Sequence, residues 1–397
     1  MKKWLLSLTL TLVLILLPLQ AQASPQENSS WYESTEGLIA EQLDDLDTND
    51  WTPFLKYVQQ EGFDLLEGES ASDVIRRLIT GQFSFSWSDM LKALIRVFFG
   101  EFNLNLVMIA KIMIIAVICG IFRNMNDSFK NSSVGEIGYF VCYSVVMILI
   151  IQSFLSILSV GKTSIDNMSG FMQLLFPLLL GLLTSMGNFS SVTIMQPAIG
   201  MIVGTVGAVL TNFVFPLITL SAVIILVNQI SKRIQIQKLG KLLNSLCSWT
   251  LAFIFTIFIS VLAIQGALTA SIDGISIRTA KFAVDTFVPI VGKMFSQSLD
   301  TIVGCALLVK NAVGAAGLII LVLICLAPAV KIFSLLFLYK LAGALLEPIT
   351  DERIVESLNG IGNVLSILLI TVLGIAIMFF MTVALLIATG NTAVMLR

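Results

Sequence analysis

The sequence has 397 residues, of which 57% are hydrophobic and 12% are charged, and its formal net charge is −2. Soluble domains carry roughly 25% charged residues, so this composition excludes a soluble globular protein and predicts an all-α protein that crosses the membrane several times. The sequence contains no histidine, which also excludes Ser-His-Asp and Cys-His catalysis and His-ligated metal sites.

The first 23 residues have the pattern of a secretory signal peptide. Two lysines precede an apolar run from Trp4 to Leu19, and a small-residue Ala-Gln-Ala site ends at Ala23. We expect cleavage before Ser24, and the alternative is an uncleaved signal anchor. Either version places the residues that follow outside the cytoplasm.

Residues 24–100 form a small acidic region, with more than half of the 25 acidic residues of the chain and five of its 23 basic ones. Short amphipathic helices fit this sequence. Ser86-x-x-Asp89 then opens a further apolar run with the spacing of a capping box. This last helix is predicted to lie along the membrane surface and to lead into the first span; an ordinary domain helix is the alternative. The region is expected to be a small extracytoplasmic domain or a partner-docking arm.

From residue 101 to 397 the chain alternates apolar runs with short polar breaks, as a multi-pass transmembrane domain does. A helical span needs about 20 apolar residues, so the run at 197–230 is too long for one span, and its Thr211-Asn212 predicts a tight turn or a broken helix. The region 327–347 carries two lysines and is expected to be interfacial or re-entrant. The predicted spans are 103–122, 137–159, 171–187, 197–212, 213–230, 249–271, 303–326 and 364–389.

Basic residues constrain the number of spans. The strongest basic loop, at 232–241, belongs in the cytoplasm by the positive-inside rule. With residues 24–100 outside, an odd number of spans must precede this loop. That condition holds if 197–230 is split into two spans, or if 171–187 is re-entrant and 197–230 is a single span. The predicted count is therefore six to eight transmembrane helices.

Two lysines fall within predicted spans. Lys111 lies in the middle of the first span, and Lys310 lies inside the seventh. A lysine that faces lipid costs a few kcal/mol, so such residues usually face a bundle interior, a partner or water. The alternative is that the long side chain snorkels to the interface. Snorkelling is the stronger interpretation for Lys310, and the two interpretations are equal for Lys111.

A charged segment follows the sixth predicted span. Arg278, Lys281 and Asp285 have spacings of three and four residues, so Lys281 and Asp285 can pair along one helical face. The functional interpretation is an interfacial helix that lines an opening or contacts a partner. The alternative is an ordinary solvated helix face.

Several functional classes have no support in the sequence. There is no Gly-x-x-x-x-Gly-Lys-Ser/Thr phosphate loop, and the short basic loop is explained by topology. The five cysteines lie in or beside apolar segments without CxxC spacing, as core residues do. The sequence therefore predicts no cofactor, no metal and no nucleic-acid partner.

Three blocks of sequence resemble the stage III sporulation protein AE family of endospore-forming bacteria. The most specific block contains Asp273-Gly274, Arg278–Phe282 and Pro289–Met294, which includes Lys293. The other two blocks are Phe176–Gly187 continuing to Gln196-Pro197-Ala198, and Leu307–Gly314 ending near Cys325–Lys331. The signal peptide, the acidic exported region and the polytopic remainder agree with the same family, so the resemblance covers essentially the whole chain.

The resemblance implies a non-enzymatic membrane subunit of the channel or secretion-like complex that joins mother cell and forespore and that late forespore gene expression requires. A permease-like role within that complex is expected. The implied location is the mother-cell membrane around the forespore. The implied partners are the lipid bilayer, the other proteins of the stage III sporulation A operon and, across the intermembrane space, stage II sporulation protein Q.

No catalytic residue carries over from the family. The candidate pore-lining or partner-contact residues are Lys111, Arg278, Lys281, Asp285, Lys293, Lys310 and Asn311. Two other functions remain open. One is a free-standing secondary transporter in which some of these charges couple an ion to a solute, and the other is a non-conducting membrane scaffold.

Overall fold

The computed structural model describes residues 49–62, 70–82, 87–128, 133–230, 237–287 and 291–395. The predicted signal peptide lies outside the described residues. All regular elements within these ranges are helices: η2 (Asn49–Trp51), α3 (Thr52–Gln60), α4 (Ala71–Ile79), α5 (Trp87–Ser128), α6 (Ser133–Ser185), α7 (Phe189–Val209), η4 (Leu210–Val214), α8 (Phe215–Ile230), α9 (Gln237–Phe287), α10 (Val291–Leu346) and α11 (Glu352–Met395).

Within the described ranges, six helical runs are long and apolar enough to cross a membrane. They are α5, α6, the continuous run α7–η4–α8, α9, α10 and α11. The predicted fold class, an all-α polytopic membrane protein with six to eight membrane helices, is confirmed. Four of the runs have 40 residues or more in these candidate spans, up to 49 in α6, whereas about 20 residues suffice to cross the hydrocarbon.

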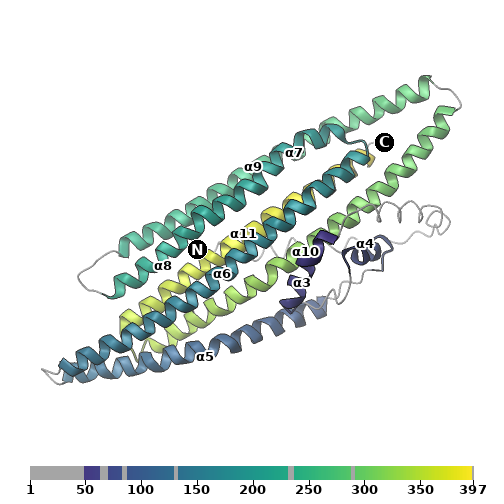
Figure 1. Cartoon of the computed structure of the whole chain (residues 1–397). Helices are drawn as coiled ribbons and strands as arrows, with labels where there is room; N and C mark the ends of the chain where they lie inside the picture. The colour runs from purple at the N-terminus through teal and green to yellow at the C-terminus, as the bar shows by residue number, and fades with distance from the viewer. Residues whose placement is uncertain are drawn as a thin grey trace.

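The long runs lie side by side in one elongated bundle, with α5 along one edge and α9 along the opposite edge (Figure 1). Helices α10 and α11 form its centre. The most apolar windows of these two helices are 67% and 61% buried, against 28% for α5 and 17% for α9. The core is correspondingly rich in α10 and α11 residues such as Val313, Ile320, Leu365 and Phe379, each with an exposure of 0%.

Two predicted breaks are wrong, because the helices continue through them. At Thr211-Asn212 the chain makes no turn; the five residues of η4 adopt a π-helix and join α7 directly to α8. The region 327–347 is not a separate interfacial or re-entrant piece but belongs to α10, which passes through Pro328. A proline removes one helical hydrogen bond, and neighbouring helices can compensate for it.

The span at 171–187 is likewise a continuation of α6, and it ends at a tight turn where Gly187 has a φ of 83°. A left-handed backbone of this kind is inexpensive for glycine. Three helical runs, α5, α6 and α7–η4–α8, therefore precede the basic loop at 232–241. The positive-inside rule requires an odd number of spans before this loop. Three runs meet this requirement, with 197–230 as a single run.

The described helices of the acidic region, α3 and α4, pack onto the bundle. Three of their side chains are buried with exposures of 0–1%: Trp51, at the N-cap of α3, Val58 within α3, and Val74 of α4. The ring of Trp51 meets the edge of Phe171 on α6 at a centroid distance of 5.3 Å. The helix that was predicted to lie along the membrane surface is not a separate element, because it forms the first part of α5.

Candidate functional site

Lys310 on α10 is the most unusual side chain of the core. It is completely buried, and its Nζ donates a hydrogen bond of 2.7 Å to the carbonyl oxygen of Ile387 on α11. Among the described residues no carboxylate forms a salt bridge with it. A buried ammonium without a counter-charge costs several kcal/mol, so stability alone would favour an apolar residue here. Lys310 is therefore the strongest functional candidate, and the snorkelling interpretation is wrong for it.

Gly390 on α11 provides the space for this ammonium. A Cβ at position 390 would collide with Lys310 Nζ and would lie 3.2 Å from Leu183 Cδ2 on α6. Helices α6, α10 and α11 thus meet around a single amino group. The absence of a side chain at 390 is what allows the lysine to be enclosed.

Asn311 extends the polar contact between α10 and α11. Its Nδ2 donates to Asn391 Oδ1 at 3.1 Å, while its own Oδ1 is buried and has no hydrogen-bond partner among the described residues. An unsatisfied buried acceptor costs about 1–3 kcal/mol. The two adjacent sequence candidates on α10, Lys310 and Asn311, therefore contact the same stretch of α11. Their polar groups are incompletely satisfied there.

The chemistry of this site is that of a buried cation beside an amide. A lysine in such surroundings can change its charge, and it can bind an anionic group if the helices separate. Within the described ranges no group of three or more His, Cys, Asp or Glu side chains could hold a metal ion. The buried ammonium and the neighbouring amide suit charge binding or helix coupling.

A second charged cluster, around Lys331 on α10, was not identified as a site from the sequence. Lys331 Nζ lies 2.6 Å from Glu61 Oε2 at the end of α3 and 3.6 Å from Glu101 Oε1 on α5. All three side chains are largely shielded, with exposures of 17–22%. Tyr57 on α3 is also affected by this cluster. Its pKa is raised to about 12, mainly because it is buried and also because of the carboxylate of Glu61. Lys331 thus links the acidic region to two long helices.

A third cluster, around Asp351, joins the end of α10 to the α5–α6 pair. Asp351 forms an ion pair with Arg123, accepts a hydrogen bond of 2.5 Å from the Tyr139 hydroxyl, and accepts one of 3.2 Å from the backbone N–H of Arg353. Burial acts to raise the pKa of Asp351, but these hydrogen bonds and the two arginines outweigh it, so the pKa lies below its usual value. This arrangement starts α11 as an N-cap does.

The other sequence candidates are not brought to the Lys310 site. Lys111 is exposed on the outer face of α5, so it does not face the bundle interior. Arg278, Lys281 and Asp285 lie in the last third of α9, which is one helix with the preceding apolar span and not a separate interfacial helix. Lys293 lies near the start of α10. The side chains of these last four residues are outside the described part of the structure.

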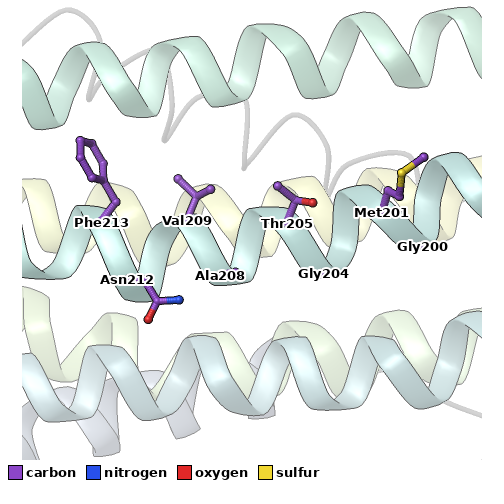
Figure 2. Close-up of a pocket in the computed structure, with 8 residues that line it drawn as sticks. All are labelled: Gly200, Met201, Gly204, Thr205, Ala208, Val209, Asn212 and Phe213. Atoms are coloured by element: carbon purple, nitrogen blue, oxygen red, sulfur yellow. The ribbon is translucent and has the colours of Figure 1, made fainter.

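A shallow groove of about 560 Å³ follows one face of α7 and η4. Met201, Thr205, Val209 and Phe213 project along the same side of the helix, as Figure 2 shows. The other lining residues are Gly200, Gly204, Ala208 and Asn212. The groove lies away from Lys310, and its small residues are typical of helix-packing surfaces.

A bundle of six long apolar helices, with buried polar groups between its central helices, defines a multi-pass α-helical membrane protein. The family model of stage III sporulation protein AE matches residues 70–390. The chain is also 33% identical over 365 residues to stage III sporulation protein AE of Bacillus subtilis (strain 168), covering 92% of this chain and 91% of that protein. No solved structure matches the chain. The chain belongs to the stage III sporulation protein AE family and is a sporulation membrane protein.

Proposed function

We propose that this protein is a non-enzymatic, permease-like subunit of a channel complex that joins the mother cell to the forespore and supports late forespore gene expression. The observation that carries the proposal is the polar contact of buried Lys310 and half-buried Asn311 between α10 and α11 in a chain of a sporulation family. Two central helices joined through polar groups that lack full partners are suited to a change of packing, as a gate requires.

In this proposal the protein resides in the mother-cell membrane around the forespore. Its acidic region faces the intermembrane space. The partners are the other proteins of the stage III sporulation A operon and, directly or through them, stage II sporulation protein Q. The exposed Lys111 supports a partner contact on α5, because a lysine on a lipid-facing surface is costly unless it meets a polar group.

A clean deletion in the organism that encodes the protein tests this function, with vegetative growth and heat-resistant spores scored together. We expect normal growth, loss of spores after engulfment, and restoration by the intact gene. Co-purification of the operon's other products with the tagged protein is expected as well. Normal spores together with a growth or nutrient defect would contradict the proposal.

That contrary outcome would favour a free-standing secondary transporter. The observation that keeps this alternative open is again Lys310, since an ionisable side chain buried between helices can mark the path of a coupling ion. A scaffold that conducts nothing should instead form normal spores when Lys310 is replaced by an uncharged residue of similar length.

A further inference from the structure

The exposed side chains of α6 change in character halfway along the helix. From Ile137 to Leu155 the exposed face is almost entirely apolar, and its large members are Ile137, Phe140, Val141, Val145, Ile148, Ile151 and Leu155. From residue 162 to the end of α6, all of which the structure describes, the exposed residues are Lys162, Thr163, Asp166, Gln173, Pro177, Gly181 and Ser185. The helix is continuous, so the change lies in its surroundings.

The run α7–η4–α8 shows the same change in the opposite chain direction. Its exposed face up to Asn212 is mostly polar or small and includes Thr193, Gln196, Gly200, Gly204, Thr205 and Ala208. After Asn212 the large exposed residues are Phe213, Leu220, Val223 and Val227. Phe189 and Met201 are exceptions in the first part, and single exposed apolar residues are normal on a water-facing surface.

Helix α10 agrees with the other two. Apart from Ile302 near its start, its large exposed apolar residues are Phe333, Phe337, Leu341 and Leu345, all beyond Lys331. Between residues 303 and 332, which are described throughout, no side chain of α10 is exposed. This apolar stretch is enclosed by neighbouring helices and does not face lipid.

The apolar band has the thickness of a membrane. At 1.5 Å per residue, the exposed apolar faces measure about 26 Å on α5 (104–121), about 27 Å on α6, about 21 Å on α8 and about 18 Å on α10. The hydrocarbon core of a bilayer is about 30 Å thick. At the end of the band that is away from the loop at 232–241, each of these helices has a charged or polar residue. These residues are Glu101, Lys162, Asn212 and Lys331. Lys111 is a charged exception within the band.

Helix α9 carries its apolar face further, from Leu239 to Leu268, about 44 Å. Helix α9 is the exception to the band, and it lies on the edge of the bundle opposite α5 (Figure 1). On α5, Leu91, Ile95 and Phe99 continue the apolar face beyond Glu101. Exposed Lys92 and Arg96 flank them, as in helices at the headgroup region.

From this distribution we infer that the bilayer covers only the half of the bundle nearest the basic loop at 232–241, and that the other halves of α6, α7 and α10 lie outside the bilayer. The predicted signal peptide and the positive-inside rule put this second half on the exported side. On α6 it extends about 35 Å beyond Lys162. The inference does not depend on the proposed function.

The apolar runs at 171–187 and 303–326 are then the core of an extramembrane helical bundle and not membrane spans. Leu175, Leu179 and Val313 in these runs are fully buried. The Lys310–Asn311 pair lies within this extramembrane core. The charged segment at 273–285 follows Leu268 on α9 and lies beyond the membrane, where a partner in the aqueous space can reach it.

Spin labels at matched exposed positions test the inference in proteoliposomes of phosphatidylethanolamine and phosphatidylglycerol. Single cysteines are introduced into a variant without the five native cysteines at Ile148 and Gln173 on α6, and at Val223 and Gln196 on the α7–η4–α8 run. All four side chains are exposed, so labelling does not disturb the core. Collision rates with oxygen, which concentrates in lipid, and with a water-soluble nickel chelate are then compared.

We expect oxygen to dominate at 148 and 223 and the nickel chelate to dominate at 173 and 196, with at least a fivefold difference in the ratio of the two rates. Oxygen-dominated relaxation at 173 and 196, equal to that at 148 and 223, would place these residues in lipid and overturn the inference. Gel filtration of each labelled variant beside the parent protein identifies any that has misfolded, and the second pair then decides.

Discussion

Lys310 and Gly390 are complementary across the α10–α11 contact, because the ammonium of the lysine occupies the space that a side chain at 390 would fill. The relationship joins a lysine that stands out in the sequence by its charge to a glycine that carries no signal in the sequence. It also shows that the burial of Lys310 is accommodated by a specific gap in the neighbouring helix.

This complementarity predicts a non-additive pair of substitutions. Gly390→Ala should destabilise the protein by about 1–3 kcal/mol through overpacking, measured as a lower Tm in detergent. Combining it with Lys310→Met, which removes Nζ, should recover most of the loss. Gly181→Ala is the matched control, since a Cβ at position 181 meets nothing within 4 Å. Equal losses from Gly390→Ala in both backgrounds would show that the two residues do not interact.

Lys310→Met alone should separate stability from function. Replacing a buried charge with an apolar side chain of similar length is often neutral or stabilising, so the Tm should stay the same or rise. If the ammonium serves the proposed complex, heat-resistant spores should fall at least tenfold at an unchanged protein level. Lys162→Met, which changes an exposed lysine, should leave both measurements unaltered. A normal spore count for Lys310→Met would instead assign the lysine a packing role.

The Asp351 cluster predicts a loss of stability in acid. The pKa of Asp351 is lower in the folded protein than the unfolded value of about 3.9. Its contribution is therefore fully present above the unfolded value and is lost as the pH falls through the folded one. The Tm in detergent should be flat with respect to this group from about pH 5 upward and should fall below about pH 4.

Asp351→Asn isolates that contribution. Tyr139 and the Arg353 N–H donate to different oxygens of Asp351, and asparagine keeps only one acceptor oxygen. That oxygen can still accept from the Arg353 N–H, and the amide NH2 can donate to the Tyr139 hydroxyl, so the variant mainly loses the ion pair with Arg123. We expect a cost of about 1–2 kcal/mol at neutral pH, in the range of charge-assisted hydrogen bonds, and a smaller difference between variant and parent at pH 3. A difference that stays constant from pH 3 to 8 would mean that the carboxylate charge contributes nothing.

The membrane class, the helical fold and the family were predictable from the sequence because they depend on composition, on local apolar runs and on short motifs. The breaks were not. Pro328 and Thr211-Asn212 resemble boundaries in a local reading, yet tertiary packing carries α10 and the α7–η4–α8 run straight through them. Local hydropathy also cannot distinguish a lipid-facing span from the buried core of a helical bundle, since both are apolar.

The site was predictable only in part, for a related reason. Lys310 and Asn311 stood out as polar residues within an apolar run, but their partners Ile387 and Asn391 lie about 80 residues away. Long-range pairs of this kind leave no local signal. The same holds for Lys331 and Glu61, which are separated by most of the chain.

The Lys331 cluster predicts that a single charge holds the acidic region against the bundle. Lys331→Glu would place three carboxylates together and should release α3, at a cost of about 2–3 kcal/mol, between the values for exposed and fully buried pairs. Limited proteolysis of the purified protein, followed by mass spectrometry, should show faster cleavage between residues 49 and 82. Glu61→Lys in the same chain should restore one ion pair and part of the protection. Lys92→Glu changes an exposed partner of Asp89 and should not alter the cleavage. Unchanged cleavage in Lys331→Glu would mean that the apolar contacts of Trp51 and Val58 hold α3 without help from the charges.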